Sequence, residues 1–437
     1  MGTIYAKTHD WDNAVGSYQG AIRVRRALES TECADEVTIA SLFYHKGRCH
    51  AQRKEYAVAK ACFESSLKYR IPLLGDKAID VALALYGMGF ALGRLKRHEQ
   101  AIVALTECLN IFRKHLGDSH IRCGDALHWI GRQHAPRSEF DRALTQYTAA
   151  LRIYKANKAN KEMDPRVVAA TLHCMGNVYE RQRRSSSGTA LKCYEEEIRL
   201  LTSLEDDGDT ASSVSLHEAL LSAANVQAKK GQYDESMINF RGALEHAKLA
   251  FGDESEQVTV ALEKMGVIHA KQGENELAKA ALTEAYSLRE VVSGRANAET
   301  ALTAFKLGCV LDKLDEQGAA GVCFEEVIRI QKNKLGLQNE TMAKSLFKMG
   351  ENYAKRGKAR SAIDCFQDVS TFFVEVLSDF LFHTATAAVQ LTLHPLLSFS
   401  HHTTVSTHQA KARRRRKRGS LSNPSPTRQC LRAHKGQ

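Results

Sequence analysis

Lysines recur at a fixed spacing along the C-terminal half of this chain, and their chemistry is electrostatic. Residues seven apart share one stripe of a helix, so two such series of ammonium groups would form parallel rows. Rows of this kind attract carboxylates by steering and point-charge contacts rather than by rigid bidentate recognition. The pattern favours a surface that binds acidic peptide segments, and a solvated face without a ligand is the alternative. One row is Lys264, Lys306 and Lys348, and the other is Lys229, Lys271, Lys313 and Lys355.

Residue types that support catalysis or metal binding form no constellation in this sequence. A phosphate-binding Gly-rich loop, an H-E-x-x-H motif and a G-x-S-x-G motif are all absent. His50, His134 and His269 share one place in a repeat, where packing against a neighbouring helix explains them better than a metal does. The 11 cysteines include no CxxC pair, which favours small buried thiols over disulfides or zinc. We therefore expect no enzyme activity, cofactor, metal or small-molecule substrate.

The lysine spacing belongs to an internal repeat of about 42 residues. Each repeat carries a small residue, a second small residue about twelve places later and a large apolar residue four places further on. A fixed period between about 20 and 50 residues is typical of stacked-repeat proteins, which act mainly as binding surfaces. The first small residues are Gly2, Gly47, Gly89, Gly131, Gly176, Ala224, Gly266, Gly308 and Gly350. The large residues are Tyr18, Phe63, Leu105, Tyr147, Tyr194, Phe240, Leu282, Phe324 and Phe366.

Each repeat contains two apolar segments of helical period. Two helices cross closely only where their side chains are small, and the large residue one turn later fills the gap. Gly231, Gly273 and Gly357 stand where a helix C-cap is expected, and Pro136 should end the first helix of the fourth repeat early. We predict an all-α fold, a right-handed superhelical solenoid of helix-turn-helix repeats.

The pattern resembles the tetratricopeptide repeat, whose usual period is about 34 residues. The longer period and the turns Leu74-Gly75-Asp76, Leu116-Gly117-Asp118 and Phe251-Gly252-Asp253 resemble the kinesin light chain family, over roughly residues 1–375. The resemblance implies a non-catalytic scaffold that binds extended peptide segments in a concave groove. It further implies a cytoplasmic cargo adaptor for microtubule-based transport, associated with the cytoskeleton and with kinesin heavy chain. The alternatives are a signalling or assembly scaffold without a motor, or the regulatory repeat region of a larger ATPase.

The same resemblance places the groove on the first helix of each repeat. With the first small residue as position 8, the lysine rows fall at positions 6 and 13, on the inner face. The first half of the groove instead offers aromatic side chains and arginines, which are favoured interface anchors. These residues are Tyr44, Tyr86, Phe90, His128 and Trp129, with Arg94 and Arg132 nearby. Asn177 and Asn225, at position 9, are partial echoes of an asparagine pair that the family carries at positions 5 and 6.

Charge and composition divide the chain into three parts. Residues 1–375 hold nine repeats, the first incomplete, and 376–400 form either a capping helix or sequence without structure. Residues 401–437 carry ten Lys and Arg and no acid, which leaves a net charge of +1 for residues 1–400. We therefore expect nucleic acid to bind only through this disordered tail, whose basic run 413–418 could also direct nuclear import. No stretch is long and apolar enough to predict a membrane span.

Overall fold

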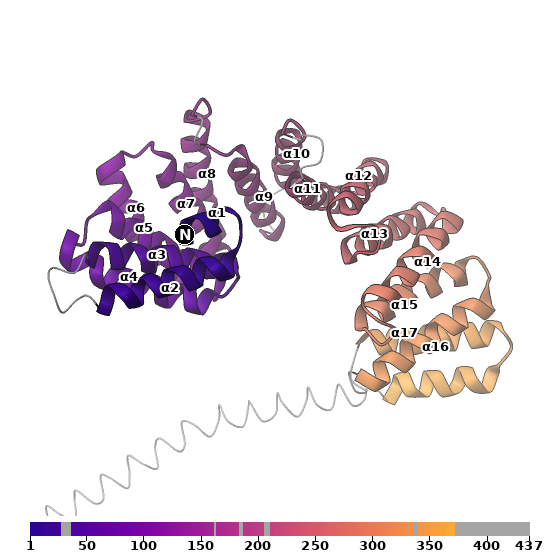
Figure 1. Ribbon diagram of the computed structural model, residues 1–437. Coiled ribbons are helices and arrows are strands. Elements are labelled where there is room, and N and C mark those ends of the chain that lie inside the picture. Colours follow the sequence, from indigo (N-terminus) through magenta and orange to yellow (C-terminus); the bar gives the residue numbers. More distant parts are fainter. Residues whose placement is uncertain (28–35, 161–162, 183–186, 205–209, 335–339, 372–437) are drawn as a thin grey trace, which may run out of the picture. The chain divides into compact units, whose positions relative to one another are not determined.

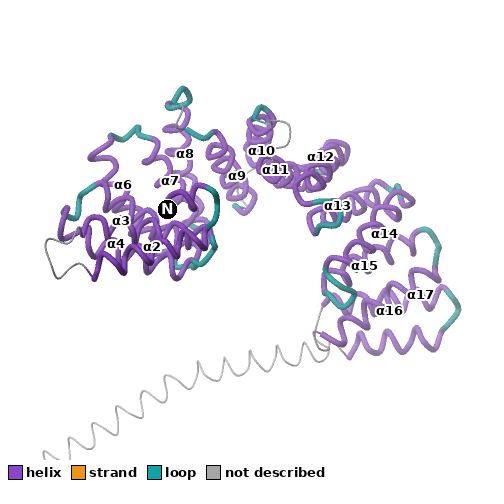
Figure 2. Tube along the Cα trace, viewed as in Figure 1, coloured by secondary structure: helices purple, strands orange, loops and turns teal. Residues whose placement is uncertain are grey.

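The computed structural model describes residues 1–371, apart from five short segments, and all regular elements in these residues are helices (Figures 1 and 2). The all-α prediction is therefore confirmed. The segments left out are 28–35, 161–162, 183–186, 205–209 and 335–339. The predicted capping helix over 376–400 and the basic tail over 401–437 lie outside the described residues.

Residues 1–316 form one compact unit in which helices pair as predicted from the repeat (Figure 1). The first helices of its repeats are α1 (Gly2–Lys7), α3 (Glu36–Gln52), α5 (Ile79–Arg94), α7 (Ile121–His134), α9 (Pro165–Arg181), α11 (Thr210–Lys229), α13 (Glu256–Gln272) and α15 (Ala298–Lys313). The second helices are α2 (Trp11–Ala27), α4 (Tyr56–Leu74), α6 (His98–Leu116), α8 (Phe140–Ala156), α10 (Ser187–Thr202), α12 (Tyr233–Phe251) and α14 (Asn275–Val292). Each second helix also packs on the first helix of the next repeat.

The second compact unit begins at Gln317. Its described residues form α16 (Gln317–Lys334), α17 (Glu340–Lys355) and a helix that runs from 359 to 371, the last residue described. Ile328 of α16 packs with Met342 and Leu346 of α17 in a small apolar cluster. This unit therefore has its own core, built from the same helix-turn-helix element.

The repeated glycine lies against the large residue that follows it, sixteen places later in most repeats and eighteen places later for Gly176 and Tyr194. A Cβ atom at Gly176 would lie 2.5 Å from the Tyr194 ring, and one at Gly131 would lie 2.7 Å from the Tyr147 ring. Real Cβ contacts are almost never this short, so a larger residue at either glycine would displace the ring packed on it. The same contact occurs at Gly2, Gly47, Gly89, Gly266 and Gly350. The sequence period thus reflects the helix-crossing point of each repeat.

The turns between the paired helices also follow the sequence prediction. Gly231, Gly273 and Gly357 adopt positive φ values of 79°, 84° and 70°, where glycine is favoured. As predicted for Pro136, α7 ends at His134 and a short 3-10 turn, η2 (Ala135–Arg137), follows it.

The three histidines at repeat position 11 are buried at the end of their helices. Each donates a hydrogen bond through Nδ1 to a glutamate five residues later, at the start of the paired helix. The bonds are His50–Glu55 at 2.6 Å, His134–Glu139 at 2.6 Å and His269–Glu274 at 2.5 Å. Their role is therefore to fasten the turn within a repeat, which adds a polar contact to the packing expected from the sequence.

Candidate functional site

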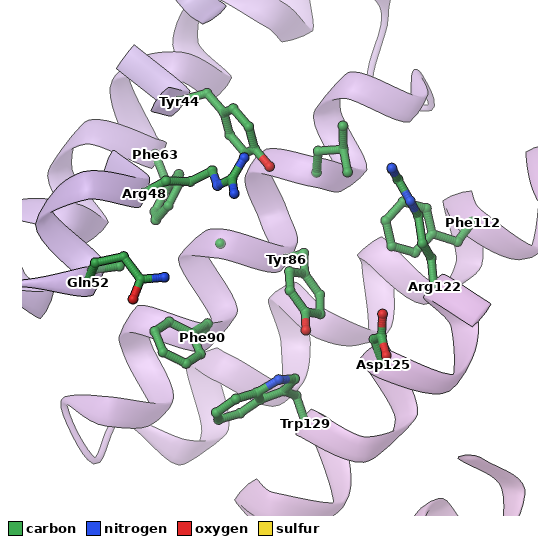
Figure 3. Close-up of a pocket in the computed structure, with 13 residues that line it drawn as sticks. Tyr44, Arg48, Gln52, Phe63, Tyr86, Phe90, Phe112, Arg122, Asp125 and Trp129 are labelled. Carbon is green, nitrogen blue, oxygen red and sulfur yellow. The ribbon is translucent and has the colours of Figure 1, made fainter. Parts of the chain in front are cut away.

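An aromatic cavity lies between the first helices of repeats 2, 3 and 4 (Figure 3). Its volume is about 470 Å³, and side chains from α3, α5 and α7 point into it. Phe63 of α4 and Phe112 of α6 complete its walls. A cavity of this size with mainly apolar walls and a few polar groups is typical of a ligand or peptide side-chain site.

Trp129 is the centre of this cavity's aromatic cluster. Its ring meets Phe90 edge to face at a centroid distance of 4.7 Å, and the Arg132 guanidinium lies 4.6 Å from the same indole. Tyr86 lines the cavity with it, and burial and the nearby charge of Asp125 raise the pKa of the Tyr86 hydroxyl. The tryptophan is therefore held by Phe90 and Arg132, while its own side chain remains partly exposed to the cavity.

Two arginines and one carboxylate give the cavity its polar character. Arg48 and Arg122 are exposed and form no ion pair among the described residues. Asp125 accepts a 2.9 Å hydrogen bond from the Tyr154 hydroxyl, and burial raises the pKa of its carboxyl group despite that bond and the charge of Arg122. Two cations and one partly desolvated acid leave the cavity with an excess of positive charge, which favours an acidic ligand.

Two glycines keep the cavity's supporting rings in place. A Cβ at Gly87 would lie 2.6 Å from Phe63, and one at Gly124 would lie 2.7 Å from Tyr154. Both glycines are therefore required by close packing on an aromatic ring, as at the repeated position 8. Gly124 lets Tyr154 reach Asp125, so this glycine indirectly fixes the acid that lines the cavity.

The structure brings together most of the aromatic residues predicted for this half of the groove. Tyr44, Tyr86, Phe90 and Trp129 all line the cavity. His128 does not, because it is 5% exposed and bonded through Nδ1 to the Thr171 hydroxyl at 2.8 Å. Burial and the charge of Arg132 lower its pKa to about 3, so it is a neutral core residue and its expected place in the groove was wrong.

Some residues of the cavity were not singled out from the sequence. Arg48 and Asp125 occupy groove positions 9 and 2 of their repeats, so the repeat register could have found them. Phe63 and Phe112 come from second helices, and only the packing shows that they reach the cavity. The predicted Arg94 lies outside its lining and stacks 5.1 Å over Tyr56.

The lysine rows prove to be partly neutralised within residues 1–316. Lys306 forms an ion pair with Glu263, a residue that is only 5% exposed on α13. Glu263 also accepts a 2.7 Å hydrogen bond from the Thr303 hydroxyl and a 3.1 Å bond from Nη2 of the buried Arg289. Burial opposes ionisation of Glu263, but the bonds from Lys306 and Thr303 and the two positive charges outweigh it, so the pKa is lowered.

The other lysines vary in their surroundings. Lys229 pairs with Glu180, Lys271 lies 5.8 Å over the Tyr233 ring, and Lys313 donates to the Ala270 carbonyl at 3.3 Å. Lys264 is half-buried and has no partner among the described residues. In the second unit, Lys348 pairs with Glu351 at 2.6 Å, and Lys355 is exposed.

The two predicted asparagines form bonds inside their own repeats. Asn177 accepts a 2.7 Å hydrogen bond from the Tyr194 hydroxyl, and Asn225 donates to the Leu221 carbonyl at 2.8 Å. Asn177 is exposed and Asn225 is half-buried. Both have spare hydrogen-bonding capacity, since a side-chain amide offers two donors and one acceptor.

Comparison with protein families identifies the repeat. Two models described as tetratricopeptide repeat match the chain at residues 38–114, 80–156 and 215–290, and at 344–371. Together the matched segments cover about half of the sequence, and they coincide with the helix pairs described above. The chain is a tetratricopeptide repeat protein. No curated protein gives a significant sequence match.

Solved structures share the fold at low sequence identity. The apo quorum sensor NprR from B. thuringiensis has a TM-score of 0.54 and 15% identity, over 85% of this chain and 99% of its own. A STAND ATPase with a tetratricopeptide repeat sensor, PH0952 from Pyrococcus horikoshii, has a TM-score of 0.56 and 13% identity, over 84% of this chain and 54% of its own. A kinesin light chain-type protein from Podosopora anserina gives 0.42 and 14%, over 49% and 98%. These likenesses concern the fold alone.

No helix in the described part of the chain is both long and apolar enough to cross a membrane.

Proposed function

We propose that this protein is a non-catalytic scaffold that binds a peptide segment of another protein in the groove formed by α3, α5 and α7. The single observation that carries the proposal is the aromatic cavity around Trp129, which opens beside two arginines without an acidic ion-pair partner among the described residues. Its walls suit one large apolar side chain, and the arginines suit a carboxylate of the same segment. Extended peptides are the natural ligands of such a surface, because a solenoid exposes a series of equivalent helix faces.

The lysines of repeats 6 to 8 would extend the acidic preference of the groove. Lys264 has no partner among the described residues, and Lys271 and Lys313 make only neutral contacts. These three can contribute steering and weak contacts to a bound carboxylate. Lys306 contributes less, because Glu263 already neutralises it. The acidic-segment proposal for this region thus rests on three cations rather than on two complete rows.

The test is peptide selection by the full-length protein. A displayed peptide library is panned against the wild type, and the affinities of the selected peptides are then measured by fluorescence anisotropy for Trp129→Ala. We expect selected peptides to share an apolar residue with nearby acids and to bind Trp129→Ala at least tenfold more weakly, as for a buried aromatic anchor.

A matched control is Phe347→Ala, which removes a 46% exposed aromatic side chain from the other compact unit. It should leave peptide affinity unchanged. Circular dichroism checks that both variants retain their helices. Equal affinities for the wild type and Trp129→Ala would contradict the proposal that this groove is the binding site.

A more specific proposal is that the protein is a cargo adaptor linked to kinesin heavy chain. It is supported by the Leu-Gly-Asp type turns, in which Gly75, Gly117 and Gly252 end their helices at φ values of 82°, 86° and 83°. Co-sedimentation of the full-length protein with kinesin heavy chain and microtubules tests it. Recovery of partners without the motor would favour a signalling or assembly scaffold. An encoded upstream nucleotide-binding domain would instead favour the regulatory region of an ATPase.

A further inference from the structure

A basic hollow of about 280 Å³ lies between α2 and α3, at the joint between repeats 1 and 2. Arg23 and Arg26 of α2 and Lys46 of α3 line it together with Ile22, Phe43 and Gln19. On α3, Phe43 and Lys46 lie three residues apart on one helix face, whereas Tyr44 and Arg48 face the groove cavity. The hollow is therefore a separate site that does not depend on the proposed groove.

Lys46 departs from the repeat at this joint. It stands immediately before the small residue at position 8, and every equivalent residue in the later repeats is apolar. Those residues are Met88, Ile130, Met175, Ala223, Met265, Leu307 and Met349. In the later repeats this place belongs to the packing between helices, as the burial of Ile130 and Met175 shows. A lysine here introduces a charge where the fold itself calls for a methionine-sized apolar side chain.

The positive charges of this hollow have only neutral partners among the described residues. Lys46 Nζ donates to Gln19 Oε1 at 3.0 Å. Arg26 Nη2 donates to the Tyr69 hydroxyl at 3.3 Å, and its guanidinium lies 5.3 Å over the Phe43 ring. No ion pair to an acid is formed by any of the three cations within the described part of the chain. Among the described residues, three positive charges thus surround one hollow without an acidic ion-pair partner.

The cations at the place of Arg26 in repeats 3 and 6 each have an acidic partner. Arg113 occupies the place of Arg26 in repeat 3, and its Nε lies 3.1 Å from the carboxylate of Asp118. Lys248 occupies it in repeat 6 and lies 3.6 Å from Asp253. A basic residue at this position is therefore common to several repeats. At the first joint it differs in that Lys46 accompanies it and no described acid pairs with it.

We propose that this hollow binds a phosphate monoester, namely the phosphorylated serine or threonine side chain of a partner protein. A phosphate monoester carries a charge of about −1.5 to −2 near neutral pH and three acceptor oxygens, which match two arginine forks and one ammonium group. A carboxylate carries a single charge and would leave more of the positive charge uncompensated. Ile22 and Phe43, the latter stacked on Tyr69 at 6.1 Å, supply an apolar wall for the methylene or methyl group that carries the phosphate.

A single hollow also fits a phosphorylated side chain better than a nucleic acid. Nucleic-acid binding requires a track of cations that follows successive phosphodiesters, each with one charge. Residues 1–400 have almost balanced charge, with a net +1. The chemistry of this site is therefore recognition of one doubly charged group.

The experiment uses the full-length protein and two phosphate probes, inorganic phosphate and a Gly-Ser peptide with one phosphothreonine. Binding is measured by ³¹P NMR titration into the millimolar range, with the unphosphorylated peptide followed by ¹H NMR. We expect the phosphopeptide to bind at least tenfold more tightly than the unphosphorylated peptide, and phosphate to displace it. Lys46→Met should weaken phosphopeptide binding at least tenfold while preserving the fold, because methionine is the residue of four equivalent positions.

The matched control is Arg113→Ala, which removes a cation at the same repeat position as Arg26 but with an acidic partner. It should leave the phosphopeptide affinity within about twofold of the wild type. Three results would overturn the proposal: no binding of either phosphate probe by the wild type, equal affinity in Lys46→Met, or an equal loss in Arg113→Ala. Stronger displacement by a single-stranded oligonucleotide than by phosphate would assign the site to nucleic acid instead. None of these variants touches the Trp129 cavity, so the two proposals fail or succeed separately.

Discussion

The aromatic cavity of repeats 2 to 4 and the lysine-bearing helices of repeats 7 and 8 show how differently two groove regions use positive charge. Around the cavity, Arg48 and Arg122 form no ion pair among the described residues. Around α13 to α15, Lys306 is tied to Glu263, which also holds the buried Arg289. A cation at a groove position is thus available to a ligand only where the packing has not already provided an acid.

The largest expected effect comes from breaking the ion network of the lysine region. Glu263→Ala leaves Arg289, which is 2% exposed, without its hydrogen-bonded carboxylate. Its Nη1 lies 3.2 Å from Glu256 and 3.5 Å from Glu299, but without the geometry of a hydrogen bond. Removing one partner of a buried pair typically costs about 3 kcal/mol or more. We expect hydrogen exchange in α13 to α15 to accelerate accordingly.

A surface pair gives the control for this change. Lys60 and Glu64 of α4 lie 2.6 Å apart, and Glu64 is 48% exposed. Glu64→Ala should change stability by about 0.5 kcal/mol or less, as is typical of exposed pairs. Equal exchange rates in the Glu263→Ala and Glu64→Ala proteins would contradict the structural role assigned to Glu263.

A smaller effect on stability should distinguish charge reversal at Lys306 from charge reversal at Lys264, although the two lysines occupy equivalent repeat positions. Lys306→Glu sets a second carboxylate beside the buried Glu263 and should destabilise α13 to α15 by about 1–3 kcal/mol, the cost of a buried polar group that loses its partner. Lys264→Glu lacks such a neighbour and should stay within about 0.5 kcal/mol while weakening any acidic ligand of this region. Urea unfolding of each variant measures the difference.

Equal stability of the two charge-reversal variants would instead favour a ligand-binding role for Lys306. If the two charge reversals were equally harmless to stability, Lys306 would be a free ligand-binding cation, as the sequence pattern predicts. A combined reversal of both lysines with Lys348 would mix loss of folding with loss of binding, so the single variants are required.

The repeat made the fold predictable because close packing recurs at every helix crossing. In seven repeats a glycine at position 8 closely contacts the large residue that follows it, sixteen or eighteen places later, which is why their spacing was visible in the sequence. The aromatic cluster followed from the same register. Side-chain pairing did not, since Glu263 looks like any other acidic residue of a helix, and only its burial against Arg289 and Lys306 reveals that it neutralises the row.

Among the aromatic residues, His128 shows the same limit of prediction from the repeat register. Its position in the repeat equals that of Tyr44 and Tyr86, both of which line the cavity. A bond to Thr171 of the next repeat draws its ring into the core instead. A contact between repeats therefore decided the outcome, and such contacts are not encoded in the period of a single repeat.

Lowering the pH should have opposite effects on the contributions of the two regions to the stability of the folded protein. The pKa of Glu263 is lowered in the folded protein, so the unfolded chain binds more protons, and this stabilisation is present above pH 4.5 and is lost as the pH falls further. The pKa of Asp125 is raised from 3.8, so its burial penalty at neutral pH is relieved as the pH falls through the raised value toward 3.8. The stability difference between wild type and Glu263→Gln should therefore shrink below pH 4.5. Asp125→Asn should be more stable than the wild type at neutral pH, and this advantage should be smallest in acid. Urea unfolding between pH 3 and 7 checks both slopes, and parallel slopes for the two variants would show that the acids of the cavity and of the lysine region share one electrostatic environment.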